Sequence, residues 1–264
     1  MTRQPGRLLP VFTISLAILG CNSNPGYQPP EPPPTALTET TTGGESNYGG
    51  PEVTAQVMTD DKAFVAQLGL MRGHLLVGVQ LYRRGELEQA ATHMKHPEDE
   101  IYAALEPALV ARNTPAMAQE LTDLATAVEN GMPVGRVNWA YQELVEKISA
   151  AERAVDLSSR QMGEVIYTLV TTAAEEYNIA RADDGSVVNA HEYQDSLGFV
   201  EVAGEYLLQI QQRGDAPPMA AAIGELLAEV KSAWPDLIPP ARLDTVPAAI
   251  YSTAARIQIA TLRQ

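Results

Sequence analysis

The strongest constraint on the fold is a helical stripe of apolar and small residues between Asp61 and Arg84. Its members recur alternately four and three positions apart: Phe64, Leu68, Met71, Leu75, Gly78 and Tyr82. This spacing places them on one face of an α-helix that packs against a core. Leu70, Val77 and Leu81 widen the stripe, so we expect this helix to be central.

Helical patterns joined by short connections account for most of the remaining chain. The predicted ranges are about 86–95, 97–112, 115–130, 133–148, 158–179, a helix from 189, 218–234 and 245–263. Ser158 with Gln161, and Asn189 with Glu192, have the spacing of capping boxes. Since no long period-two alternation appears, the predicted fold class is all-α, an antiparallel helical bundle that forms one large unit or two small ones.

The N-terminus has the pattern of a secretory signal. Arg3 and Arg7 precede an apolar run over 8–19, which is shorter than the roughly 20 residues that span a bilayer. The ending Ile18-Leu19-Gly20-Cys21 resembles the bacterial lipoprotein signal, in which the cysteine is diacylated and becomes the mature N-terminus. The alternative is an ordinary cleavable signal followed by a stray cysteine.

A stretch rich in Pro, Gly, Thr and Ser follows the cysteine. Such a composition cannot bury enough apolar surface to offset the entropy of ordering, so we predict a disordered tether. The predicted organisation is a signal peptide over 1–20, a tether over 21–57 and a helical domain over 58–264, with halves at 58–156 and 157–264 if it divides. Asn22 after the cysteine implies, through the lipoprotein resemblance, the outer membrane.

The composition argues against anionic partners and against disulfide bonds. The formal net charge is −15, which disfavours nucleic acid and anionic lipid surfaces because both carry the same sign. Cys21 is the only cysteine, so an intramolecular disulfide is excluded. The folded part must therefore be stabilised by its core.

Three of the chain's four histidines lie close together in sequence: His74, His93 and His96. His74 belongs to the central helix, where a neutral imidazole is either a hydrogen-bonded core residue or a transition-metal ligand. His93 and His96 are three apart, which would place both on one helical face. Because Pro97 disfavours helical backbone at the residue before it, we expect His96 to cap the following helix.

The fourth histidine, His191, starts a predicted helix, with Asp195 one turn later as a hydrogen-bond partner or second ligand. The candidate metal ligands are therefore His74 and His93 first, then His96 and Glu100, with His191 and Asp195 contributing if the halves pack together. The alternative is that all these histidines are structural. We predict no catalytic residues, since no nucleophile, phosphate-loop or dinucleotide motif occurs.

Two segments resemble known families. The segment MRGHLLVGVQLYRRGELEQAATHMKHPEDEIY is similar to exported helical proteins of proteobacteria found alongside iron-uptake components. The segment EEYNIARADDGSVVNAHEYQDSLGF resembles the periplasmic domain of large bacterial iron permeases. Its matching positions are Tyr177, Asp184, Gly185, Val187, Glu192, Tyr193 and Phe199. This resemblance implies an exported helical bundle that works near metal uptake.

The chain is also distantly similar to imelysins, but it departs from their Gly-x-His-x-x-Glu motif. His74 follows Gly73, whereas the position three beyond His74 is Val77. A weaker likeness to a single tetratricopeptide unit runs through Gly78 and Tyr82, and no second copy follows.

These observations predict a non-enzymatic periplasmic lipoprotein that binds a transition metal, iron or copper, or assists an iron-uptake system. Its partners would be the lipid bilayer, through acylated Cys21, and a metal-uptake membrane protein, but not nucleic acid. The alternative is a metal-free helical module for protein–protein interaction.

Overall fold

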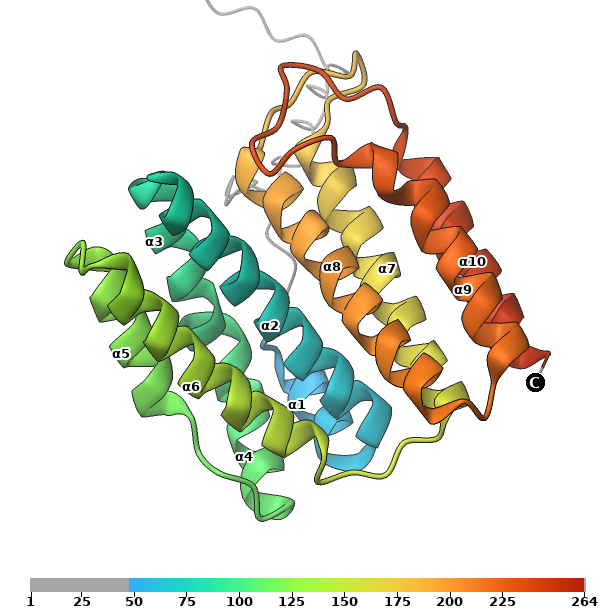
Figure 1. The fold of residues 1–264 in the computed structure, drawn as a ribbon, viewed down its shortest axis with the longest axis horizontal. Helices are drawn as coiled ribbons and strands as arrows, with labels where there is room; N and C mark the ends of the chain where they lie inside the picture. The colour runs from blue at the N-terminus through green and yellow to red at the C-terminus, as the bar shows by residue number, and fades with distance from the viewer. Residues whose placement is uncertain (1–47, 264) are drawn as a thin grey trace, which may run out of the picture. The chain divides into compact units, whose positions relative to one another are not determined.

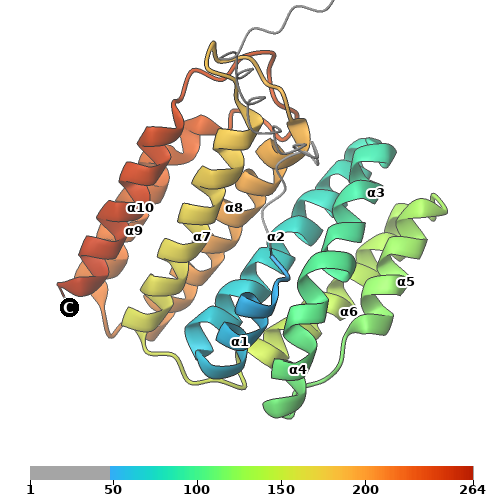
Figure 2. The same ribbon diagram turned by 180° about the vertical axis from the view of Figure 1, so that it is seen from behind.

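The computed structural model describes residues 48–263, apart from the side chains of Asp99 and Glu100. Throughout this range the chain forms helices connected by loops, the longest of them over 234–246, as Figures 1 and 2 show, which confirms the predicted all-α class. Extended pairing within these residues is limited to isolated bridges between Arg181 and Val187 and between Ser186 and Arg242.

The helices form two groups that lie side by side (Figure 1). The first contains α1 (Pro51–Thr59), α2 (Asp61–Arg84), α3 (Leu87–His96), the π-helix η1 (Pro97–Tyr102), α4 (Ala103–Ala111), α5 (Ala118–Glu129) and α6 (Val134–Glu152). The second contains α7 (Ser159–Ala180), α8 (Ala190–Arg213), α9 (Pro217–Val230), the short 3₁₀-helix η2 (Lys231–Ala233) and α10 (Pro247–Leu262).

The helix α2 joins the two groups. It packs against α3 and α6 of its own group and against α7 and α8 of the other. Its predicted stripe is buried, and so are the three residues expected to widen it. The helix is long and apolar enough to cross a membrane by composition, but most of its apolar window is buried in the bundle, as in a core helix. The predicted central role is confirmed.

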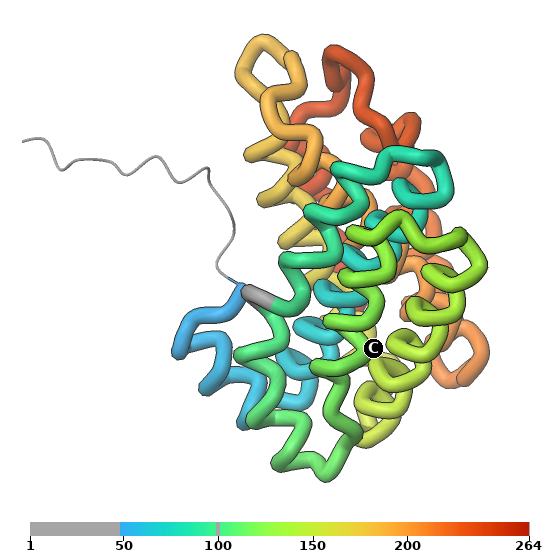
Figure 3. The backbone as a smooth tube through the Cα atoms, turned by 90° about the vertical axis from the view of Figure 1, so that its left-hand side faces the viewer, coloured from blue at the N-terminus to red at the C-terminus, as the bar shows by residue number. Residues whose placement is uncertain are grey.

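The folded part begins earlier than expected. The tether was predicted to extend to residue 57, but Pro51–Thr59 forms α1, which packs against α2 and α4 (Figure 3). The prediction was wrong here because a composition poor in large apolar residues still supplies Val57, which is buried against the core. All described residues belong to one compact unit, so the halves considered at 58–156 and 157–264 are not separate.

The backbone at His96 also differs from expectation. His96 is helical, with φ −53° and ψ −45°, and α3 continues through it into the π-helix. Within an α-helix the ring of Pro97 would clash with the carbonyl four residues earlier. The wider π-turn removes this conflict, so His96 does not serve as a cap and stays on the same helical run as His93.

The predicted caps were correct in part. Ser158 and Gln161 form the full capping box. Asn189 caps α8: its side-chain oxygen accepts from the backbone N–H groups of His191 and Glu192, and its side-chain amide donates to Oε1 of Glu192 at 3.5 Å. The helix expected from about residue 115 starts later: the Thr114 hydroxyl donates to the Leu109 carbonyl at 3.0 Å, and α5 begins at Ala118.

The two groups approach most closely where α2 crosses α8. An added Cβ at Gly198 would lie 2.5 Å from the Gly73 carbonyl oxygen, and one at Gly73 would lie 2.6 Å from the Phe199 ring. Backbone therefore touches backbone at this crossing. The contact places His74, next to Gly73, beside the first turns of α8.

Candidate metal centre

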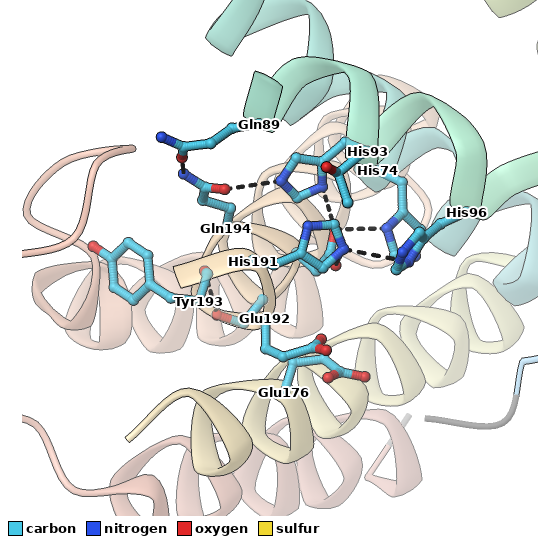
Figure 4. A network of polar contacts seen from close by, with 12 residues as sticks. His74, Gln89, His93, His96, Glu176, His191, Glu192, Tyr193 and Gln194 are labelled. Atoms are coloured by element: carbon cyan, nitrogen blue, oxygen red, sulfur yellow. Dashed lines mark hydrogen bonds and ion pairs between the residues drawn. The ribbon is translucent and has the colours of Figure 1, made fainter. Parts of the chain in front are cut away.

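All four histidines of the chain converge on the carboxylate of Asp195 (Figure 4). His74 comes from α2, His93 and His96 from α3, and His191 from the first turn of α8. The helices α3 and α8 are remote in sequence but are both held against α2. The side chains of His74, His93 and Asp195 are fully or almost fully buried.

Asp195 uses both of its oxygens within the cluster. Its Oδ1 atom lies 2.6 Å from Nδ1 of His74 and 2.9 Å from Nδ1 of His93. Its Oδ2 atom lies 3.0 Å from Nε2 of His191, one helical turn away. The carboxylate therefore divides the histidines between its two oxygens.

His96 completes the second set. Its Nδ1 atom lies 3.3 Å from Nε2 of His191. The rings of His191 and His93 stack with centroids 4.0 Å apart. Two overlapping triads result, one of His74, His93 and Asp195, and one of His96, His191 and Asp195, in each of which the ligand atoms lie within 4.8 Å of one another.

This spacing is close to that of atoms around one ion. Nitrogen and oxygen ligands bound at about 2.0 Å in tetrahedral geometry lie about 3.3 Å apart. The contacts at Asp195 and between His96 and His191 run from 2.6 to 3.3 Å. Small movements of the side chains would therefore suffice to hold an ion.

His93 has the surroundings of a metal ligand. Its Nδ1 atom faces Asp195, and its Nε2 atom lies 2.9 Å from Oε1 of Gln194, whose Nε2 in turn donates to Oε1 of Gln89 at 2.6 Å. Both ring nitrogens thus face oxygen acceptors, yet burial lowers the pKa of His93 and favours the neutral ring, which has one N–H. A cation at Nδ1 resolves this conflict, because the ring then donates its Nε2–H to Gln194.

His74 supplies the second sign of a missing partner. Its ring is fully buried, and neither nitrogen makes a hydrogen bond of suitable geometry among the described residues. The 2.6 Å approach of Nδ1 to Asp195 satisfies an ion-pair distance but not the angle of a hydrogen bond. Buried polar atoms are rarely left without a hydrogen bond. A cation at this point would bind Nδ1 of His74 and Oδ1 of Asp195 together.

The charges suit a cation. Burial alone would raise the pKa of Asp195, but His74 and His93 hold it well below the usual value, so the carboxylate is charged. Burial makes the largest contribution to lowering the pKa of His96 to about 4, and the neighbouring His191 and His74 lower it further. At neutral pH His93 and His96 are therefore in the neutral form that binds metals.

Three further side chains with oxygen atoms, those of Tyr48, Glu176 and Glu192, lie next to the centre. The phenol of Tyr48 donates to Oε1 of Glu176, and the Tyr48 ring meets that of His74 edge-on at 5.6 Å. Burial, followed by the carboxylates of Glu176, Asp195 and Glu192, raises the pKa of Tyr48 well above its ordinary value. These residues were not among the predicted ligands.

The second helix group is the part of the chain that a known family covers. Residues 152–262 match the iron permease-associated 4-helix bundle domain. The match spans α7 to α10 and contains the segment that resembles the iron permeases, so that resemblance is confirmed. We found no match to the chain among curated proteins or among solved structures.

The segment that matches the permease-associated domain supplies only part of the centre. His191, Gln194 and Asp195 lie within it, whereas the other three histidines come from α2 and α3 in the preceding group. The centre is therefore assembled where the matching segment meets the helices that precede it in the chain.

The structure brings together five of the six predicted ligands: His74, His93, His96, His191 and Asp195. The side chain of the sixth, Glu100, lies outside the described residues, as does Cys21. Glu176 was not predicted as a ligand, although the sequence contained a signal. It is a charged residue within the apolar stripe of Ala173, Tyr177 and Ala180 on α7. Gln89, Gln194 and Tyr48 gave no such signal.

Proposed function

We propose that the protein binds a transition metal at the histidine centre and serves an iron-uptake system as a non-enzymatic subunit. The observation that carries the proposal is the convergence of all four histidines on the buried carboxylate of Asp195. The match of residues 152–262 to the iron permease-associated domain supports the link to iron uptake.

The donor set narrows the class of metal. Imidazole suits iron, copper, zinc and nickel, whereas magnesium and calcium prefer oxygen ligands alone. With Asp195 charged and His93 and His96 neutral, a divalent ion would find one negative charge and as many as four nitrogen donors. We infer that iron or copper is the ion held in the cell, consistent with the iron permease connection.

The proposed location follows from the N-terminus. The signal over 1–20 would direct export, and diacylation of Cys21 would anchor the protein to the periplasmic side of the envelope, at the outer membrane. A tether shorter than the predicted one would then connect the anchor to the bundle. The partner would be a metal-uptake membrane protein, toward which the permease-associated domain is the natural contact.

The experiment is elemental analysis of the full-length protein, purified without chelators, together with melting curves at increasing metal concentration. We expect stoichiometric metal and a stabilisation of about 2.7 kcal/mol when free metal reaches 100 times Kd. Asp195→Asn, which keeps the side-chain shape, should lose both. Asp123→Asn, an exposed carboxylate on α5, is the matched control and should keep both.

One observation favours a second candidate, the metal-free interaction module. The cluster is already connected internally, because His93 contacts both Asp195 and Gln194 and His191 contacts His96. In that case the histidines form a polar core, and wild type and Asp195→Asn would be equally free of metal. Replacing His93 and His96 would then leave the protein's partners bound in a pull-down from solubilised envelopes.

A further inference from the structure

A second set of donors, made only of oxygen atoms, lies beside the histidine centre. It consists of the phenol of Tyr48 and the carboxylates of Glu176 on α7 and Glu192 on α8. In Figure 4 the side chains of Glu176 and Glu192 extend to a common place next to the histidines. Each of the three comes from a different segment of the chain.

The two carboxylates are deeply buried. Glu176 is 0% exposed and Glu192 is 3% exposed. An isolated carboxylate in such surroundings is strongly unfavourable unless a proton or a cation compensates its charge. Among residues 48–263 no lysine or arginine forms an ion pair with Glu176, and its Oε2 atom has no hydrogen-bond partner. This oxygen is the unpartnered buried atom that a cation would satisfy.

Tyr48 is held so that its phenol oxygen faces these acids. Its O–H donates to Oε1 of Glu176, and its backbone carbonyl accepts a 2.6 Å hydrogen bond from Nε2 of Gln67. Its ring meets the rings of His74 and Phe199 edge-on, with centroid distances of 5.6 and 6.2 Å. Tyr48 is 8% exposed, so the phenol is fixed by contacts at both ends.

The second set adjoins the histidine centre through α8. Glu192 and Asp195 are three residues apart and therefore lie on the same helical face. Both carboxylates, like that of Glu176, act electrostatically on the Tyr48 phenol. Asp195 thus faces the histidines with its two oxygens while contributing negative charge to the neighbouring oxygen set.

We propose that Tyr48, Glu176 and Glu192 form a second cation site, selective for ferric iron, adjacent to the histidine centre. Carboxylate and phenolate are hard oxygen donors and suit a small trivalent cation, whereas the histidines suit softer divalent ions. On binding, the O–H bond of Tyr48 breaks and an oxygen–iron bond forms. The proton leaves to solvent, and no electron is transferred.

The test is titration of the full-length protein with ferric citrate, followed by visible absorption. A tyrosinate bound to ferric iron has a phenolate-to-iron charge-transfer band. We expect the band to saturate at one equivalent, to disappear in Tyr48→Phe and to require about tenfold or more ferric citrate in Glu176→Gln. Tyr251→Phe, the same change at an exposed tyrosine of α10, is the matched control and should keep the band.

Tyr48→Phe retains the ring contacts but loses the hydrogen bond to Glu176, so we expect a lower melting temperature with a transition that stays cooperative. A cooperative transition excludes misfolding as the cause of a lost band. No band in wild type, or an equal band in Tyr48→Phe, would overturn the oxygen site. The histidine centre is assayed separately by zinc binding, which His93→Ala should remove while sparing the band. If the protein binds zinc but shows no band, only the oxygen site is contradicted. If it shows the band but binds no zinc, only the proposed histidine centre is contradicted.

Discussion

The Nδ1 atom of His93 lies 2.9 Å from the Oδ1 atom of Asp195, although the two residues are separated by 102 positions in the chain. His93 belongs to α3 in the first helix group, and Asp195 belongs to the segment that matches the iron permease-associated domain. This contact therefore ties the two groups together at a buried polar point. Residues that hold the His93 ring from outside the centre should therefore affect metal binding as well.

Gln194 is the clearest of these supporting residues. It accepts from Nε2 of His93 and is itself oriented by Gln89. Removing such an outer partner of a ligating histidine weakens metal binding about 10- to 100-fold. We expect Gln194→Ala to raise the Kd for zinc by this factor in a competition titration with a chromogenic chelator.

Two comparisons make the Gln194 prediction specific. Gln194→Glu keeps an acceptor for the Nε2–H of His93 and should restore most of the affinity. Gln211→Ala, an exposed glutamine on the same helix, should leave the Kd unchanged. Equal affinity of Gln194→Ala and wild type would show that His93 needs no outer partner.

The crossing of α2 and α8 should be sensitive to a single methyl group. Gly198→Ala would place a Cβ 2.5 Å from the Gly73 carbonyl oxygen, and backbone cannot move aside cheaply. Overpacking of this kind costs about 1–3 kcal/mol. We expect that loss in urea unfolding, together with weaker metal binding, because separating the helices moves His74 away from Asp195.

Gly204 on the same helix provides the control for this prediction. An added Cβ there meets nothing within 4 Å. Since alanine is a better helix former than glycine by about 1 kcal/mol, Gly204→Ala should be neutral or stabilising. Equal destabilisation by both changes would mean that the close crossing is not what limits stability.

The metal-free protein should lose stability as the pH falls from about 6.5 to about 4. Burial lowers the pKa of His96 to about 4 in the folded protein, whereas an unfolded histidine has a pKa of about 6.5. The unfolded state therefore binds more protons in this window, so protonation favours unfolding. Urea unfolding followed by circular dichroism at several pH values measures the slope.

His96→Gln removes the titrating ring and should make the slope shallower in the same window. His93, whose pKa burial also lowers, contributes in the same direction, so some slope should remain. A free energy of unfolding that is constant over this range, or that rises on acidification, contradicts the assignment of His96 as a partly buried neutral ring.

The proposed anchor gives a prediction about location. Cys21→Ser removes the only thiol that could be acylated. We expect the wild-type protein to sediment with envelope membranes and to incorporate labelled palmitate, and the variant to do neither. Folding should be unaffected, because Cys21 lies outside the described bundle. Continued palmitate labelling of the variant would exclude lipidation at this residue.

The sequence predicted some features well because they depend on local pattern. The α2 stripe and the Ser158 cap follow from spacing along one helix. The prediction that the helix ends before Pro97 was wrong, because a π-turn accommodates the proline within the helix. Such turns are rare, and neighbouring residues alone do not specify them. Local preference at His96 was overridden by the continuous helical run.

The candidate centre was predictable in composition but not in arrangement. The histidines were identified by residue type, yet the contact between His93 and Asp195 depends on how α3 and α8 pack against α2. Tyr48 was assigned to the tether because its neighbours are glycine- and proline-rich, and only tertiary packing shows its phenol beside Glu176. Long-range packing of this kind leaves no periodic trace in one sequence.

The division of the ligands between the two helix groups has a consequence for cooperativity. His74, His93 and His96 come from one group, and His191 and Asp195 from the other. An ion that binds all of them holds the two helix groups together. Release of the ion and separation of α3 from α8 are therefore linked steps of one equilibrium. A chain consisting of α7 to α10 alone would present a half-site, open to completion by ligands from another protein.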